Sequence, residues 1–404
     1  MASLGVTIIF PEGNLWKKNN RYAFQYLIAM YENKIGVPSK STNTHPLRNK
    51  AGLLAVLAIA SLVLMPVLSA KSVDGWLSWR GPLQSGVSLE KNLPDSLELD
   101  GESHLWSYPV NGGGAPVIAD GRAYVFGYYE ENEGKLVEET LLCLDANSGK
   151  KIWEYRSRDF LSDNVYNRYG IGSPCVDAET GNVYFMPTSG IALAFDRDGN
   201  KLWEHSMLEE YWRLTFPNGR TGGPVIEGDF VIFRGITANW GPSGPPGDRF
   251  YGFDKRTGEL AWASAPDIKP VDSSNSSPTF TDLDGRRVFI AGTGSGSIIC
   301  SNVRTGEPVW RVTISTGGVN ASVLPYGDDM FIAIHGKENI DSTAKGRLVC
   351  YRVPSKYPLG DKPVILSEKD EVWRNDEHVS FSSSPVLHNG RVYSTIATGS
   401  LLCV

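Results

Sequence analysis

Hydrogen-bonding and aromatic side chains gather in a few long polar segments of the sequence. Arg and Asn supply forked hydrogen bonds, and Tyr and Trp supply flat apolar faces, so this mixture suits sugars, carboxylated polymers and extended peptides. The candidate binding residues are Tyr166, Asn167, Arg168, Arg213, Asn218, Arg220, Asn239, Trp240, His335, Lys337 and Asn339. Arg and Asn also cap loop backbone in proteins that bind nothing, and that structural role is the alternative for each of them.

The motifs of catalysis and metal binding are weak. GTGSGS (292–297) resembles a glycine-rich phosphate loop, but no helical pattern follows it. DRDGN (196–200) and DLDG (282–285) have the acidic spacing of calcium loops, yet both coincide with hairpin turns and lack the downstream Glu of an EF-hand. The six His residues show no ligand spacing, and the sequence has no Gly-x-Ser-x-Gly elbow. We therefore predict no metal site and name no catalytic residue.

The elements that must position the candidate residues are internal repeats. LLCLDANSGKKIWEY (141–155) is matched by IALAFDRDGNKLWEH (191–205), FYGFDKRTGELAWAS (251–265) and SIICSNVRTGEPVWRV (297–312). The corresponding Trp residues recur at intervals of 47 to 63 residues, a period typical of propellers and solenoids. A second constant piece, such as GAPVIADGRAYVFG (114–127) or SSPVLHNGRVYSTIA (383–397), opens each unit.

Each unit reads as two β-hairpins, which we name strands A, B, C and D in chain order. The Asp-Gly, Asn-Gly and Thr-Gly turns favour tight hairpins, because Gly and Asn tolerate positive φ. Four antiparallel strands repeated about every 50 residues predict an all-β fold, a β-propeller of four-stranded antiparallel blades. In the C–D hairpins we expect Asp to accept turn hydrogen bonds, Gly to adopt a left-handed conformation and Trp to pack on a neighbouring blade. These structural residues are Asp145, Gly149, Trp153, Asp196, Gly199, Trp203, Asp254, Gly258, Trp262, Gly306 and Trp310.

The two faces of such a ring differ in sequence. The A–B and C–D turns are short, except for the stretch between Tyr351 and Trp373, whereas the B–C loops and the D-to-A connections hold the long polar segments. Because loops on a rigid scaffold carry most binding groups, we expect ligands or partners at this second, loop-rich face.

The repeat D-x-x-T/S-G-x-x-x-W, with its preceding S-P-x-x-x-x-G hairpin, resembles the pyrroloquinoline-quinone-type (PQQ-like) propeller repeat. Quinoprotein dehydrogenases and the outer-membrane protein assembly factor B share this repeat. WLSWRGPLQSGVS (76–88) resembles the start of exported propellers from planctomycete-like bacteria. The dehydrogenases imply adjacent cysteines against the quinone and a calcium held by Glu, Asn and Asp. Adjacent cysteines are missing here, so we predict neither PQQ nor calcium.

The N-terminal region has the composition of a targeting sequence. Residues 51–70 are uncharged, follow Arg48 and Lys50, and end in Leu-Ser-Ala, a small-residue cleavage site. We predict an unfolded extension over 1–50, a signal peptide or membrane anchor over 51–70, and the propeller over 71–404. The protein is then exported to the periplasm or cell surface. Met30 is an alternative start, because a signal peptide normally begins close to its basic region.

Charge and cysteine usage limit the class of partner. The first 50 residues carry a net charge of +5 and the rest −11, so the predicted ring is a poor nucleic-acid binder. The cysteines at 143, 300, 350 and 403 share one position in strand C, so we expect most to be buried free thiols.

The sequence also ends within a strand C: six A–B hairpins precede it, and HLWSYPV (104–110) is a D-type strand. The fragment of a seven- or eight-bladed ring is the preferred interpretation, and a closed ring of six, with 400–404 paired to 104–110, is the alternative.

Two functions remain open at this stage. The first is a non-catalytic exported propeller that binds an envelope protein or polymer through its loop-rich face. The second is a quinone-dependent dehydrogenase, or another small-molecule oxidoreductase, that uses the central pocket. The missing catalytic signatures favour the first function.

Overall fold

The computed structural model describes residues 6–8, 72–93, 96, 101, 103–131, 136–158, 169–211, 222–237, 246–267, 269–358 and 362–404. Apart from loops and the short 3-10 helix η1 (Glu368–Asp370), these residues form β-strands, which confirms the predicted all-β class. The chain separates into two units, residues 1–9 with 72–404 and residues 10–71, and only the first holds described residues. The targeting segments therefore stay predictions.

The described strands form successive antiparallel sheets, the blades of a β-propeller. The first sheet contains β4 (Val117–Ala119), β5 (Arg122–Glu131), β6 (Leu136–Asp145) and β7 (Lys151–Ser157). The second contains β8 (Cys175–Val176), β9 (Val183–Phe185), β10 (Ile191–Phe195) and β11 (Lys201–Ser206). The third contains β12 (Val225–Glu227), β13 (Phe230–Thr237), β14 (Gly247–Asp254) and β15 (Leu260–Ser264). The fourth sheet contains β16 (Thr279–Leu283), β17 (Arg286–Gly292), β18 (Ser297–Asn302) and β19 (Pro308–Thr313). The fifth contains β20 (Leu324–Tyr326), β21 (Met330–Glu338), β22 (Lys345–Arg352) and β24 (Glu371–Asn375). The sixth contains β25 (Val386–His388), β26 (Arg391–Thr395) and β27 (Leu401–Cys403).

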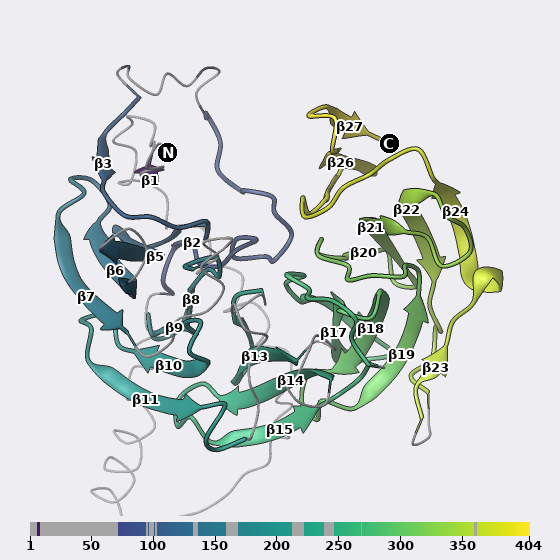
Figure 1. Cartoon of the computed structure of the whole chain (residues 1–404), viewed down its shortest axis with the longest axis horizontal. Coiled ribbons are helices and arrows are strands. Elements are labelled where there is room, and N and C mark those ends of the chain that lie inside the picture. Colours follow the sequence, from purple (N-terminus) through teal and green to yellow (C-terminus); the bar gives the residue numbers. More distant parts are fainter. Residues whose placement is uncertain are drawn as a thin grey trace, which may run out of the picture. The chain divides into compact units, whose positions relative to one another are not determined.

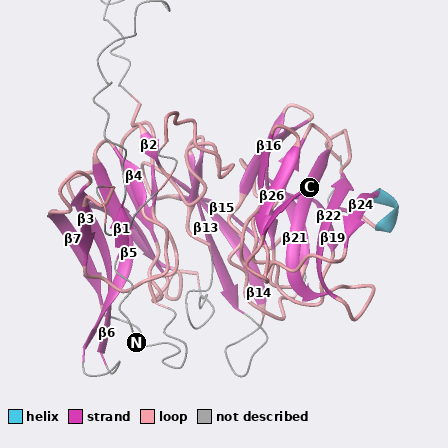
Figure 2. Cartoon of the chain, turned by 90° about the horizontal axis from the view of Figure 1, so that it is seen from above, coloured by secondary structure: helices cyan, strands magenta, loops and turns pink. Residues whose placement is uncertain are grey.

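The sheets follow one another in chain order, with the D strands β7, β11, β15, β19 and β24 along their outer side (Figure 1). The strands run between two faces that carry the turns and loops (Figure 2). Apolar side chains fill the space between neighbouring sheets. One cluster joins Leu141 of the first sheet to Phe185 of the second, and another joins Trp203 of the second to Phe253 of the third.

The repeated Trp fastens each of the first four D-type strands to the C–D turn of the following sheet. The Nε1 atom of Trp153 donates to the Arg197 carbonyl (2.9 Å), and its ring covers Gly199. Gly199 has φ +89°, a left-handed conformation that favours Gly, and a Cβ there would lie 2.8 Å from the indole. The backbone conformation and the close contact therefore both require Gly at this position. The same indole-to-carbonyl bond joins Trp106 to Ala146, Trp203 to Lys255 and Trp262 to Val303.

The turn Asp residues hold these C–D turns in shape. The Oδ1 atom of Asp145 accepts hydrogen bonds from the Asn147 and Ser148 backbone amides, and Asp196 binds its own turn in the same way. These bonds lower the pKa of both carboxyl groups. The calcium-like spacing at 196–200 therefore serves a turn. GTGSGS at 292–297 likewise connects β17 to β18.

One D strand has an extra neighbour. The expanded connection between β22 and β24 contains β23 (Val364–Ile365), which pairs in parallel with the outer edge of β19. At the two ends of the propeller, β3 (Trp106–Tyr108) pairs with β1 (Val6–Ile8), and β27 pairs with β26, within the described residues. The closed-ring pairing of 400–404 with 104–110 is therefore not observed.

The segment after β2 (Gly75–Trp76) crosses from the first two sheets to the sixth. β2 pairs with β4, and the carbonyl of Leu77 accepts a hydrogen bond from the Val176 amide (2.8 Å). Arg80, 3% exposed, then donates to the carbonyls of Gln84, Ser85 and Pro385 at 3.2, 2.8 and 2.8 Å. Its guanidinium thus anchors the sixth sheet across 305 residues of sequence.

The cysteines are free thiols, four buried and Cys403 exposed. Burial raises the pKa of Cys143 and of Cys350 to about 11, so both remain protonated and unreactive near neutral pH. They act as small apolar residues in the core.

Candidate functional site

The structure describes three of the eleven predicted binding residues, all at the loop-rich end of the fifth sheet. His335 and Lys337 lie in β21, and Asn339 follows it. The other eight fall outside the described residues: Tyr166, Asn167, Arg168, Arg213, Asn218, Arg220, Asn239 and Trp240. The site is therefore built around Lys337.

Lys337 lies in an open pocket of about 440 Å³, formed where three connections between sheets meet the end of β21. Residues 271–272 lead from the third sheet to the fourth, 316–317 from the fourth to the fifth, and Phe381 belongs to the connection from the fifth to the sixth. The lining residues are Val271, Asp272, Thr316, Gly317, Gly336, Lys337, Glu338, Lys345 and Phe381. We call this the loop-face pocket.

The Lys337 side chain is fixed by two neighbours. Its Nζ atom lies 2.8 Å from Oδ2 of Asp272 and 5.0 Å from the centroid of the Phe381 ring, a cation–π geometry. Gly317 leaves room for the lysine stem, since a Cβ there would lie 3.1 Å from Cγ of Lys337. The ammonium group is thereby held at the pocket wall, where it presents a charge beside the exposed faces of Phe381 and Val271.

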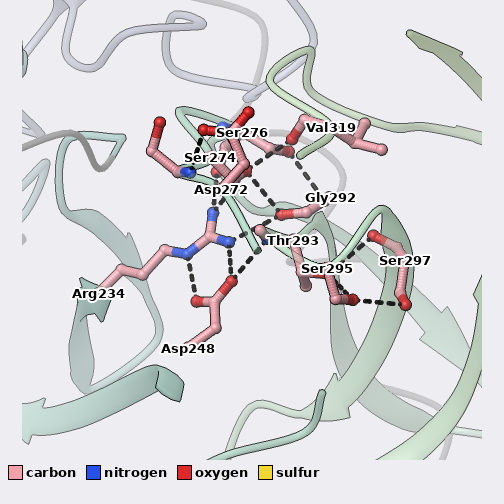
Figure 3. A network of polar contacts seen from close by, with 12 residues as sticks. Arg234, Asp248, Asp272, Ser274, Ser276, Gly292, Thr293, Ser295, Ser297 and Val319 are labelled. Atoms are coloured by element: carbon pink, nitrogen blue, oxygen red, sulfur yellow. Dashed lines mark hydrogen bonds and ion pairs between the residues drawn. The ribbon is translucent and has the colours of Figure 1, made fainter. Parts of the chain in front are cut away.

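Asp272 is itself positioned by a buried network between the third and fourth sheets (Figure 3). Arg234 on β13 forms a bidentate ion pair with Asp248 on β14, at 2.8 and 2.6 Å. Oδ2 of Asp248 accepts the Gly294 amide (3.0 Å), and the Gly294 carbonyl accepts the Asp272 amide (3.0 Å). A continuous chain of hydrogen bonds thus runs from Arg234 to the acid that holds Lys337.

The remaining guanidinium hydrogens of Arg234 are also used. Nη1 donates to Ser274 Oγ and the Ser276 carbonyl, and Nη2 donates to the Gly292 carbonyl. Arg234 and Asp248 are both nearly inaccessible to solvent. With its charges paired and its donors occupied, this network positions the loops and does not bind a ligand.

Glu139 on β6 has the equivalent role between the first and second sheets. Its carboxylate accepts hydrogen bonds from the Gly170 amide (3.0 Å) and from the amide and hydroxyl of Thr188 (both 2.7 Å). Burial raises the pKa of the Glu139 carboxyl group, and this effect exceeds the lowering that the hydrogen bonds cause. Glu139 and Asp248 each lie six residues before a C–D turn Asp. That shared spacing could have revealed the pair in the sequence.

His335 and Asn339 lie beneath the surface and do not line the pocket. Each is 1% exposed, and neither the imidazole nitrogens nor the side-chain amide atoms of Asn339 have a hydrogen-bond partner among the described residues. Burial, with the neighbouring Arg347 charge, lowers the pKa of His335 to about 4. The neutral imidazole is a core group at physiological pH, so Lys337 alone of the three reaches the pocket.

A second pocket of about 230 Å³ opens between the 77–84 segment and strands β8 and β12, next to the A–B turns. Its one Lys, Lys255, is 3% exposed and paired with Asp177 (2.9 Å) and Glu179 (2.8 Å). These contacts join the second and third sheets, so the charged groups of this pocket are already used.

The described residues offer no set of ligands for a quinone–calcium site. Within these ranges no group of three or more His, Cys, Asp or Glu side chains is arranged to hold a metal ion, and the cysteines lie on separate strands. The described residues also contain no helix long and apolar enough to cross a membrane.

Comparison with known proteins gives consistent matches. The family model described as outer membrane protein assembly factor BamB matches residues 96–239 and 209–404. The BamB protein of Burkholderia pseudomallei (strain K96243) is 25% identical over 278 residues, which cover 67% of this chain and 61% of that protein. Quinoprotein ethanol dehydrogenase of Pseudomonas putida is 25% identical over 240 residues, 52% of this chain and 34% of that protein. The crystal structure of BamB from Moraxella catarrhalis aligns with a TM-score of 0.38 and 16% identity over 69% of this chain and 83% of that one. The chain thus spans less than two thirds of the length of either curated relative.

Proposed function

Since the chain belongs to the family of outer membrane protein assembly factor BamB, we propose that it is a non-catalytic β-propeller that binds a protein partner in the cell envelope through its loop-rich face. Under this proposal the protein is exported, and the apolar run at 51–70 directs the export. The curated BamB relative supports an envelope role, and the exposed loops of a rigid scaffold are suited to holding a partner.

The observation that carries the proposal is the loop-face pocket. It combines an oriented ammonium group on Lys337, an exposed aromatic ring on Phe381 and an exposed aliphatic group on Val271. Aromatic anchors beside fixed charges are typical of the residues that dominate protein–protein binding energy. Val271 and Phe381 come from two different connections between sheets and Lys337 from β21, so the pocket depends on the packing of neighbouring sheets.

A quinone-dependent reaction receives no comparable support. The quinoprotein relative shares the repeat, but the described residues do not supply adjacent cysteines or a ligand cluster, and we derive no redox step.

Site-directed photo-cross-linking in the native envelope tests the proposal. A photoreactive residue at Phe381 should give one discrete adduct with an envelope protein, and Lys337→Glu in the same chain should reduce that adduct at least about tenfold, as loss of roughly 1.4 kcal/mol of binding would. The control is a photoreactive residue at Asp229, which is exposed in a tight A–B turn. An equal adduct from Asp229, or none from Phe381, would contradict a partner site at the loop-rich face.

A further inference from the structure

The D strands, whose outer edges bound the sheets, share one local distortion. In each of β7, β11, β15, β19 and β24, the residue before the Trp is skipped in the pairing with strand C, a β-bulge. The bulged residues are Ile152, Leu202, Ala261, Val309 and Val372. They occupy equivalent positions, so their burial can be compared directly.

Only one of these edges is covered within the described residues, and there the bulged residue is buried. Val309 is 1% exposed, whereas Leu202 is 46% exposed. The difference coincides with β23, which pairs with β19 so that Val364 lies opposite Trp310 and Ile365 opposite Arg311. Bulges usually discourage edge pairing, yet this bulged edge accepts a strand. The chain itself therefore shows that its D-strand edge can be extended.

The contacts of β23 define what such an edge binds. Leu366 is 6% exposed and shares a hydrophobic cluster with Val309 and Val312, against which Val364 also packs. Ile365, between them, is 60% exposed. The Leu366 amide donates to the Arg311 carbonyl (2.9 Å). An extended aliphatic-x-aliphatic segment thus buries alternate side chains while its backbone pairs with the edge.

β11 presents the same features without a covering strand among the described residues. Leu202 corresponds to Val309, and His205, two residues after the Trp, corresponds to Val312. The His205 ring stacks on Phe253 at 5.2 Å between centroids. Its nitrogens are used within the chain, Nδ1 with the Glu210 carboxylate and Nε2 with the Gly258 carbonyl, both at 2.7 Å, so a covering side chain would meet the ring carbons. Glu204, the counterpart of Arg311, is exposed and forms an ion pair with Lys201 (2.7 Å), an exposed contact of the kind that contributes little to stability. The middle residue of an incoming segment would face this carboxylate.

We propose that the outer edge of β11 binds an extended segment of a partner protein with the pattern aliphatic–basic–aliphatic, paired in parallel as β23 pairs with β19. The two aliphatic side chains cover Leu202 and the His205 ring, and the basic residue lies opposite Glu204, because opposite charges directly across a strand pair are favourable. This edge is on the circumference of the propeller. The proposal does not depend on the loop-face pocket.

The test uses the full chain and synthetic peptides with the sequence of residues 362–370. One peptide carries Ile365→Lys and the other Ile365→Glu. The Lys peptide should bind and should slow amide hydrogen exchange in residues 201–206. It should bind at least about tenfold more tightly than the Glu peptide, a ratio that about 1.4 kcal/mol supplies. Glu204→Lys in the protein should reverse the preference between the two peptides.

Matched variants separate the edge from non-specific binding. Leu202→Lys, which places a charge at the bulge, should abolish binding of the Lys peptide, while Ala261→Lys at the equivalent bulge of β15 should leave it unchanged. Equal effects of the two variants, binding without exchange protection in 201–206, or no reversal by Glu204→Lys would overturn the proposal. Self-association of the chain through Leu202, with no peptide binding, would also overturn it and identify a second copy as the occupant.

Discussion

His335 should make the stability of this propeller depend on pH in a specific direction. The buried imidazole has a pKa of about 4, whereas an unfolded chain binds the same proton near the ordinary value of 6.5. Between these values the unfolded state holds more protons than the native state, so the free energy of unfolding falls as pH falls. The His335 contribution is fully present above about pH 6.5 and is lost progressively down to about pH 4.

The size of the effect follows from the separation of the two pKa values. Each unit of pKa difference corresponds to about 1.4 kcal/mol, so roughly 2 kcal/mol should be lost between about pH 8 and about pH 5, and about 3 kcal/mol below pH 4. The environment supports this sign, because Arg347 lies opposite His335 in the β21–β22 pair and opposes a second positive charge.

The assay is denaturant unfolding of the wild type and of His335→Leu at a series of pH values. Leu removes two buried nitrogens that lack partners, so the variant should be close to wild type near pH 8 and more stable by about 2 kcal/mol near pH 5. Taking the difference between the two proteins cancels the titrating groups that do not interact with His335. His388→Gln, at the exposed end of β25, is the control and should parallel the wild type. A difference between wild type and His335→Leu that does not change with pH would refute the reasoning.

Two further predictions concern the fastening of the sheets. Gly199→Ala should lower the free energy of unfolding by roughly 2 to 4 kcal/mol in chemical denaturation, because it adds a clash with the Trp153 ring to the cost of a left-handed residue. The control is Gly121→Ala, at φ +76° with open space around it, which should lower it by only about 1 kcal/mol in the same assay. Arg80→Met should leave buried carbonyls without donors, so amide hydrogen exchange in residues 386–403 should become faster while exchange in 225–264 changes little. A uniform change in exchange across both ranges would contradict the role of Arg80 as the anchor of the sixth sheet.

The fold could be predicted because its determinants are local and repeated. An Asp and a Gly four residues later specify the C–D turn, and the Trp four residues after the Gly supplies the ring that covers the turn of the following sheet, as at Asp145, Gly149 and Trp153. The spacing could not specify which strand would meet β3, because several strands share the same short apolar pattern. β1 and β27 are both compatible with that position by pattern.

The site was harder to predict because it joins residues that are distant in sequence. Asp272 and Phe381 lie on two different connections between sheets, and Lys337 lies near the end of β21. No local pattern says which of these segments converge. Polarity alone selected His335 and Asn339, although both are buried. Their position in or beside a strand whose neighbouring sheets cover it outweighs their polar character, at the cost of unpaired hydrogen-bonding groups.

The two faces of the propeller differ in function because neighbouring sheets are joined differently at each face. At the tight-turn face, the Trp side chains and Lys255 bind the turns of the neighbouring sheets, so these groups are already used in holding the sheets together. At the loop-rich face, the joining groups are buried carboxylates, Glu139 and Asp248, which lie below the connections they bind. The connections above them keep their outward side chains available while their backbones are fixed. A partner that docks at the loop-face pocket therefore meets groups that are already positioned, and binding loses less conformational entropy than it would on a mobile loop.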